Sequence, residues 1–488
     1  MADHAVAIAG GGPVGMLLAS ELALAGVDVV VLERRPNQDL LGSRAGGLQS
    51  RAIELLDQRG IADRFLADGK TVQAATFASV VLDISDFPTR HPYALGLFQN
   101  HIERILAGWL RELGVTTEYG ADVTGFAQAD RGIDVELADR GSIRAEYLVG
   151  CDGGRSLVRR VAGIDFPGWE ATVSNLIAEV EVSEETPTGV RHDATGIHGL
   201  QLMADGRTVR IVTTERAVGP AAEPTLDDLK RALISVYGTD FGVHSPTWLS
   251  RFTNATRQAA AYRKNRVLLA GDAAHVHSPA GGQGLTVGFQ DAVNLGWKLA
   301  QVVKRTSPDT LLDTYQAERH PAGYRAIRHT MAQTAMMRPD DDAEALREAV
   351  AELCRMDEPR RLLGGLMSGL DTHYDLGEGH PQLGRRMPDL DLRVDTGSVR
   401  VFSLMHAARP LLLNLGAPGA VDIRPWSDQV TLVDARFDGV WELPVLGAVP
   451  APDAILVRPD GHVAWVGNGT AAGLDDALTA WIGAAPAR

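Results

Sequence analysis

The stretch HAVAIAGGGPVGMLLASELALAGVDVVVLE, residues 4–33, decides the fold of the chain. A short apolar run is followed by a glycine-rich turn, a helical segment that stops at Gly26, and a β-branched run that ends at Glu33. Strand, turn, helix and strand in this order make a βαβ unit, which places two parallel strands side by side. These residues therefore predict a Rossmann-like α/β domain.

The turn matches the pattern G-x-G-x-x-G, with Gly10, Gly12 and Gly15 at the fixed positions and Pro13 after the second glycine. Gly10 permits the tight turn, Gly12 lets the backbone approach a diphosphate, and Gly15 lets the helix pack on the sheet. The diphosphate is expected at the helix N-terminus, where N–H groups and the helix dipole favour negative charge. Glu33 is placed to accept hydrogen bonds from ribose hydroxyls. The segment predicts a dinucleotide site and leaves FAD and NAD open.

Two later apolar strands also end in aspartate. Residues 147–149 lead to Asp152, and residues 266–270 lead to Gly271 and Asp272. In parallel sheets of this kind, ligands bind beside the carboxyl ends of the strands. Each aspartate could instead cap a helix that follows it. Three such elements in one chain favour a shared ligand site.

These motifs resemble those of the class A flavoprotein monooxygenases of the p-hydroxybenzoate hydroxylase type. The matching stretches are the Gly10–Gly15 loop with Glu33, C-D-G-G-R-S at 151–156, and Gly271-Asp272 followed by P-A-G-G-Q-G at 279–284. The resemblance extends over nearly the whole chain. It is strongest to bacterial hydroxylases of angucycline and anthracycline polyketides, with R-P-D-G-H-V-A-W at 458–465. It implies FAD as cofactor and NADPH as co-substrate.

The resemblance also implies roles for individual residues. Glu33 would bind the adenosine ribose, Asp272 the ribityl or diphosphate part of FAD, and Asp152 both FAD and NADPH. The loop from Pro279 to Gly284 would line the isoalloxazine, with backbone N–H groups that stabilise a negatively charged reduced flavin. The other candidate FAD contacts are Arg34, Arg44, Gln99, Gly282, Gln283 and Leu285.

The motifs imply no definite role for several polar residues that lie near them. Arg34 and Arg35 would suit a 2′-phosphate, but because FAD should occupy this loop, both are expected mainly as solvated charges. Many relatives carry Asn where this chain has Thr286; flavin binding should survive, whereas the electrostatics or mobility of the reduced flavin could differ. We assign no catalytic base, and expect surface or hydrogen-bonded roles for His192, His198, His244, His275 and His277.

The length of 488 residues suggests about three domains, at roughly 150 residues each. We predict an α/β + β architecture with a discontinuous FAD-binding domain, an inserted mixed-sheet substrate-binding domain that forms the apolar floor and lid of the pocket, and a C-terminal thioredoxin-like domain. Their respective residues are 1–70, 100–170 and 268–387; 71–99 and 171–267; and 388–488. The last segment contains no cysteine, so it is expected to serve packing or dimer contact and not redox chemistry.

Composition excludes several classes of function. The net charge of −15 argues against a nucleic-acid partner, which would need clustered Lys and Arg. Cys151 and Cys354 form no metal or redox pattern, so no metal site is predicted and a reducing cytoplasm is expected. No apolar run of about eighteen residues is present, which argues against a membrane span. The oligomeric state is left open between a monomer and a homodimer.

We therefore expect an FAD-dependent oxidoreductase, a monooxygenase of antibiotic biosynthesis that hydroxylates a polycyclic aromatic polyketide. The resemblance implies that it uses O2 and NADPH or NADH, through a flavin C4a-hydroperoxide. Only one G-x-G-x-x-G unit is present, so NADPH is expected to bind transiently in a groove. Two alternatives stay open: Baeyer–Villiger or other flavin oxygenation of a quinone antibiotic, and a flavin-binding protein without catalysis.

Overall fold

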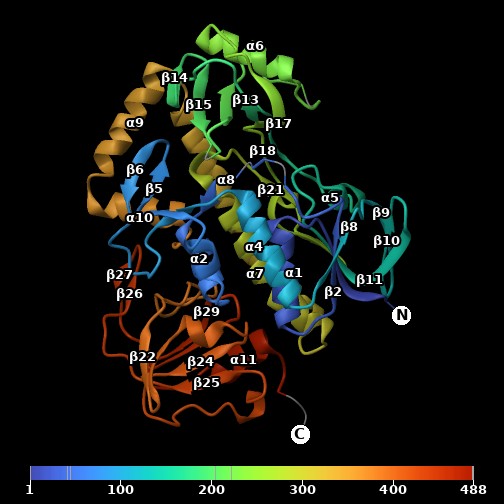
Figure 1. The fold of residues 1–488 in the computed structure, drawn as a ribbon. Coiled ribbons are helices and arrows are strands. Elements are labelled where there is room, and N and C mark those ends of the chain that lie inside the picture. Colours follow the sequence, from blue (N-terminus) through green and yellow to red (C-terminus); the bar gives the residue numbers. More distant parts are fainter. Residues whose placement is uncertain (1, 41, 44, 204, 221, 486–488) are drawn as a thin grey trace.

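Figure 1 shows the computed structural model of the chain, which describes residues 2–40, 42–43, 45–203, 205–220 and 222–485. A central body of long helices and a large sheet carries a smaller sheet at the top of the view and a C-terminal module at the bottom. Within the described ranges, no helix combines the length and the apolar character that a membrane span requires.

The largest sheet forms the centre of the molecule. Its main path runs in the order β19-β20-β11-β1-β2-β8, and β10 and β9 extend it beside β11. β1 is parallel to both of its neighbours, β11 and β2, so the predicted βαβ unit is confirmed. The strands are β1 (His4–Ala9), β2 (Val29–Glu33), β8 (Thr116–Tyr119), β9 (Val123–Ala129), β10 (Gly132–Leu137), β11 (Gly141–Gly150), β19 (Arg263–Lys264) and β20 (Val267–Leu269).

Helices cover this sheet and bury its apolar strands. Val6, Ala7 and Ile8 of β1 are fully buried, as a central strand of a parallel sheet requires. α1 follows the glycine turn and packs against α7, where Gly288 lies so close to Val14 that a side chain there would collide with it. The helices of this body are α1 (Pro13–Leu24), α2 (Ser50–Asp57), α3 (Ala62–Leu66), α4 (Gln99–Glu112), α5 (Leu157–Val161), α7 (Gly284–Val303) and α8 (Asp313–Met336).

A five-stranded antiparallel sheet lies at the top of Figure 1, in the order β14-β15-β16-β13-β17. Its strands are β13 (Ser174–Glu181), β14 (Gly189–Asp193), β15 (Gly196–Leu202), β16 (Thr208–Thr214) and β17 (His244–Thr253). Helix α6 (Leu226–Tyr237) starts at a capping box formed by Thr225 and Asp228. Leu229 and Leu233 of α6 pack on one face of the sheet, which leaves the opposite face to other contacts.

Short strands form three further sheets. They are β3 (Gly47–Leu48), β7 (Ala94–Gly96) and β4 (Lys70–Val72); β5 (Ala74–Phe77) and β6 (Val80–Asp83); and β12 (Gly168–Trp169), β18 (Thr256–Gln258) and β21 (His275–Val276). The sequence groups 71–99 with 171–267 in one sheet domain, but in the described part of the chain the strands of these two segments pair in separate sheets. Helices α9 (Asp341–Leu353) and α10 (Asp357–Ser368) lie beside β5 and β6. The domain boundaries stay a prediction.

The C-terminal module is built on a four-stranded sheet in the order β25-β24-β28-β29. β24 and β25 are parallel, and β28 and β29 form a hairpin around Asp460. The elements are β22 (Asp391–Val394), β23 (Gly397–Arg400), β24 (Leu411–Asn414), β25 (Thr431–Asp434), β26 (Glu442–Leu443), β27 (Gly447–Ala448), β28 (Ala454–Val457), β29 (Val463–Gly467) and α11 (Leu474–Ile482). The thioredoxin-like assignment of this module stays a prediction.

Candidate functional site

Three loops meet at the carboxyl ends of β1, β11 and β20, which are neighbours in the sheet. Gly10 has φ +107°, and a side chain there would overlap the carbonyl oxygen of Cys151 and lie 3.1 Å from Cα of Asp152. A side chain on Gly271 would lie 3.1 Å from Val14, at the start of α1. The glycine turn, the Asp152 loop and the Gly271 turn therefore form one continuous surface.

The glycines of the turn have the surroundings that a diphosphate site requires. A Cβ on Gly15 would overlap the carbonyl oxygen of Gly10, so only glycine permits this approach of helix and turn. Apart from the neighbours of Gly12 in the chain, no described residue has an atom within 4 Å of its Cβ position, which leaves that side of the turn open. Pro13 is the first residue of α1, so its lack of an N–H group costs no helical hydrogen bond.

Glu33 lies buried at the end of β2 and faces the turn. Its Oε2 accepts a hydrogen bond from the N–H of Gly11 at 2.7 Å, and its Oε1 accepts one from the N–H of Arg35 at 2.8 Å. The guanidinium of Arg35 reaches Glu33 at 3.2 Å and Glu103 at 2.8 Å. Burial lowers the pKa of Arg35, but the two carboxylates outweigh it and raise the pKa. The expectation of a solvated Arg35 is therefore wrong, because this residue joins two buried carboxylates.

The other residues predicted to contact FAD near Glu33 are Gln99, Arg34 and Arg44, and their surroundings differ. Gln99 is the first residue of α4; its N–H donates to Ser43 Oγ at 2.8 Å, and its Nε2 donates to Glu103 Oε1 at 2.8 Å. Arg34 is exposed, as expected of a solvated charge. Arg44 lies outside the described residues. Ser43 and Glu103 join this cluster although no sequence motif pointed to them.

The two aspartates of the later strands offer oxygen atoms to a ligand. Oδ2 of Asp152 accepts a hydrogen bond from the N–H of Val158 at 3.0 Å, while its Oδ1 is buried and has no partner in the described chain. Asp152 thus caps α5 with one oxygen and presents the other, so the two roles considered for it are compatible. Asp272 is exposed, and its carboxylate forms no hydrogen bond or ion pair with any described residue.

The loop from Pro279 to Gly284 leads into α7. Gly281 and Gly282 both have positive φ, 75° and 63°, a conformation that favours glycine. The carbonyl of Gly281 accepts a hydrogen bond from Nε2 of Gln49 at 3.1 Å, and Nε2 of Gln283 donates to the carbonyl of Leu366 at 2.9 Å. Residues outside the loop therefore hold it at its middle and near its carboxyl end.

Gly284 and Leu285 begin α7 and have the unbonded N–H groups of a first helical turn. Thr286 follows them and is buried; its Oγ1 accepts a hydrogen bond from the N–H of Gln49 at 3.3 Å. The hydroxyl thus connects the start of α7 to the residue that precedes α2. Gln49 holds the loop at two points, and no pattern in the sequence singled it out.

The histidines occupy surface or hydrogen-bonded positions. His192 and His244 are exposed, and His198 lies 2.9 Å from Thr213 Oγ1. His275 Nε2 lies 2.7 Å from Asp291. Burial lowers the pKa of His277, whose Nδ1 lies 2.9 Å from the carbonyl of Ser278. None of these contacts identifies a catalytic base.

The face of the five-stranded sheet opposite α6 is turned toward the loops of the central body. Arg210 of β16 donates to the carbonyl of Ser43, and its guanidinium lies 4.9 Å from the ring centroid of Phe98. A side chain on Gly42 would collide with the indole of Trp248. The strand pairing places Ile177, Val212, Trp248, Phe252 and Ile197 on this face.

Comparison with known proteins covers the whole chain. Residues 3–330 match the FAD binding domain family, and residues 380–485 match the family described as aromatic-ring hydroxylase, C-terminal. The 12-dehydrotetracycline 5-monooxygenase/anhydrotetracycline 6-monooxygenase of Streptomyces rimosus is 44% identical over 98% of each chain. The rifampicin monooxygenase of Streptomyces venezuelae is 43% identical over 99% of each.

Solved structures agree with this assignment. The anhydrotetracycline hydroxylase OxyS from Streptomyces rimosus superimposes with a TM-score of 0.90 at 42% identity, over 99% of this chain and 100% of that one. Not every full-length relative is named for an oxygenation: the dialkyldecalin synthase of Streptomyces rugosporus is 39% identical over 98% of this chain and 99% of its own. Identity at this level fixes the family and leaves the substrate to be identified.

Proposed function

The chain belongs to the family of FAD-dependent aromatic-ring hydroxylases, and on that premise we propose that it hydroxylates a polycyclic aromatic polyketide. As a member of this family it is a flavoprotein monooxygenase that binds FAD and uses NAD(P)H. Bound FAD supplies the chemistry that combines electrons from NADPH with O2, and the protein supplies binding and geometry.

The observation that carries the proposal is the convergence of three loops on one edge of the central sheet. Gly12 leaves its side of the turn open, and Asp152 and Asp272 present oxygens without protein partners in the described chain. In our proposal the start of α1 binds the diphosphate, Glu33 orients the adenosine ribose, and Asp272 accepts hydrogen bonds from the ribityl or diphosphate part. The unbonded N–H groups at Gly284 and Leu285 would stabilise negative charge on the pyrimidine edge.

The side chains on the face of the five-stranded sheet opposite α6 support the proposal of an aromatic substrate. Ile177, Val212, Trp248 and Phe252 lie on it, and all but Ile177 are only half-buried in the described structure. A flat, multi-ring molecule would cover these side chains and remove water from the reacting centre. Two full-length relatives are named as monooxygenases of anhydrotetracycline and of rifampicin, which supports this class of substrate.

The C-terminal module fits a thioredoxin-like domain that has lost redox chemistry. The strand order β25-β24-β28-β29, with one parallel and two antiparallel pairings and a final helix, supports this proposal. Cys151 and Cys354 both lie outside it, so 388–488 contains no thiol.

Anaerobic stopped-flow reduction of the holoenzyme by NADPH tests the proposed reaction, with and without a panel of tetracyclic polyketide phenols, followed by mixing with O2. We expect substrate to accelerate flavin reduction and an oxygenated product to form; product NMR then separates ring hydroxylation from Baeyer–Villiger insertion. A holoenzyme whose flavin NADPH never reduces with any ligand would refute the monooxygenase and favour a non-oxidative role.

A matched pair of variants locates the substrate. Val212→Phe places a larger side chain on the face of the sheet opposite α6. It should abolish the acceleration of flavin reduction by substrate, while FAD stays bound. Val440→Phe is the control, because Val440 lies in the C-terminal module, away from this sheet, and is 68% exposed. Equal behaviour of the two variants would place the substrate elsewhere.

A further inference from the structure

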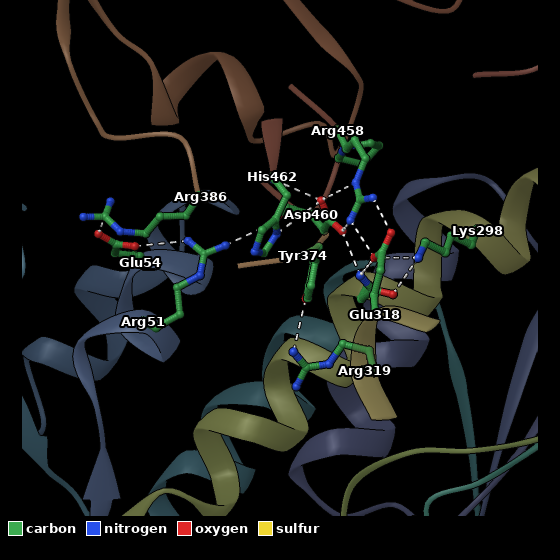
Figure 2. Close-up of polar contacts among 12 residues, drawn as sticks. Arg51, Glu54, Lys298, Glu318, Arg319, Tyr374, Arg386, Arg458, Asp460 and His462 are labelled. Carbon is green, nitrogen blue, oxygen red and sulfur yellow. Dashed lines mark hydrogen bonds and ion pairs between the residues drawn. The ribbon is translucent and has the colours of Figure 1, made fainter. Parts of the chain in front are cut away.

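The turn between β28 and β29 is buried, although hairpin turns usually lie at the surface. Arg458, Asp460 and His462 of this turn are at most 1% exposed. Figure 2 shows them inserted beside the helices of the central body. The burial of a charged turn indicates that the C-terminal module does more than cover the surface of its neighbour.

The turn binds three helices of the central body. Arg458 forms two hydrogen bonds with Glu318 of α8, at 2.6 and 2.9 Å. A carboxylate oxygen of Asp460 accepts a hydrogen bond from Asn294 of α7 at 3.1 Å, and its backbone carbonyl accepts one from Arg51 of α2 at 3.1 Å. These helices carry the candidate flavin site, because α7 begins at the glycine loop and α2 follows the residue that holds this loop.

A chain of contacts leads from the turn toward α8 (Figure 2). The ring of His462 lies against the ring of Tyr374, with 4.3 Å between centroids and 30° between planes. The hydroxyl of Tyr374 accepts a hydrogen bond from Nη1 of Arg319 at 3.1 Å. Nη2 of Arg319 donates to the carbonyl of Val287 at 3.0 Å, within the first turns of α7. Arg319 is 1% exposed, so these contacts determine its orientation.

Arg319 holds the carboxylate that supports the Gly271 turn. Its Nε donates to Oδ1 of Asp291 at 2.7 Å. Oδ2 of Asp291 accepts hydrogen bonds from the N–H of Gly271 at 3.0 Å and lies 2.7 Å from Nε2 of His275. Burial would raise the pKa of Asp291, but His275 and Arg319 outweigh this effect and hold the pKa below its usual range. The turn that presents Asp272 is therefore fixed by a charged, fully buried carboxylate.

We propose that the C-terminal hairpin is part of the flavin-binding apparatus, and that Tyr374 and Arg319 are positioning residues that set the Gly271–Asp272 turn through Asp291. A guanidinium that loses one buried acceptor must reorient or stay unsatisfied, and its carboxylate partner moves with it. The inference rests on FAD binding and is independent of which compound is oxidised.

Tyr374→Phe tests the proposal, because it keeps the ring against His462 and removes only the acceptor of Arg319. Tyr147→Phe is the matched control: Tyr147 is 1% exposed and Tyr374 is 2% exposed, and the hydroxyl of Tyr147 donates to Asp309 at 2.9 Å, outside the chain of contacts. The apoproteins are titrated with FAD, and hydrogen–deuterium exchange is followed in peptides that cover 267–276.

We expect Tyr374→Phe to raise the dissociation constant of FAD about fivefold, in the lower range of coupling between distant sites. Exchange in 267–276 should accelerate in the apoprotein, and Tyr147→Phe should change neither quantity. Unchanged affinity and exchange in Tyr374→Phe, or equal changes in both variants, would overturn the inference. A wild-type protein that binds no FAD would contradict the proposed function, while the exchange measurement would still test the positioning of the turn.

Discussion

Replacing His462 with phenylalanine tests how the C-terminal hairpin is held at low pH. The imidazole of His462 is 1% exposed; neither ring nitrogen forms a hydrogen bond in the described structure, and Nδ1 lies 3.6 Å from Oδ1 of Asp460. Burial lowers the pKa of His462 from 6.5 to about 4; Asp460 opposes this shift, and Arg51 and Arg458 reinforce it. The folded protein therefore keeps this side chain neutral at pH values where the unfolded chain would protonate it.

The magnitude follows from proton linkage. Below pH 6.5 the unfolded chain binds a proton at His462, and the folded chain does so only near pH 4. Stability is therefore lost as the pH falls through this window, by about 1.4 kcal/mol per pH unit and about 3 kcal/mol in total. Phenylalanine keeps an aromatic ring against Tyr374 and has no proton to bind. The variant should lack this part of the acid sensitivity.

Urea unfolding of the wild type and His462→Phe at pH values from 7 to 4 measures the effect. At each pH we take the difference in unfolding free energy between the two proteins, so that carboxylates common to both cancel. The difference should change in favour of the variant by about 3 kcal/mol across the window. His192→Phe, at an exposed histidine, is the control and should show a flat difference. If the difference in unfolding free energy between the wild type and His462→Phe is equally independent of pH, the reasoning is refuted.

Three further predictions concern the site and its support. Gly10→Ala should abolish FAD binding, because alanine is strained at φ +107° and its Cβ would overlap the Cys151 carbonyl; fluorescence titration with FAD measures this, and retained affinity would contradict it. Asp272→Ala should weaken FAD binding and leave the melting temperature of the apoprotein unchanged, because its carboxylate has no partner in the described chain; a destabilised apoprotein would show a structural role instead. Glu318→Gln should destabilise the protein by about 3–5 kcal/mol in urea unfolding, because it leaves Lys298 buried without its carboxylate and Arg458 with Asp460 alone; a loss below about 1 kcal/mol would show that Lys298 finds another partner.

Local patterns were enough to predict the central sheet and its glycine turn. The run from His4 to Glu33 forms the expected strand, helix and strand. Backbone sterics and the alternation of apolar residues act over a few neighbouring positions, so they can be recognised without knowledge of the rest of the fold.

Contacts between distant segments could not be predicted in this way. Arg35 was expected in solvent because FAD was expected to occupy its loop, and nothing near Arg35 in the sequence indicates its ion pair with Glu103 of α4. The pairing of Asp291 with Arg319 joins residues 28 positions apart, and that of Arg458 with Glu318 joins residues 140 apart. Asp291 is a charged residue within the apolar run of α7, which is a sign of a buried ion pair. The sequence did not show that Arg319 is its partner.

The amino-acid sequence by itself determined the βαβ unit and the family, because the unit depends on local backbone geometry and the family on motifs that each lie within a few residues. The residues that bind the cofactor stay a prediction. The tertiary structure alone decided which strands pair in 71–99 and 171–267, and how the C-terminal hairpin is bound. The two partners of a buried ion pair cannot be identified from the sequence. The desolvation of each charge is offset only by a partner at close range, and only the folded chain determines which residue that partner is.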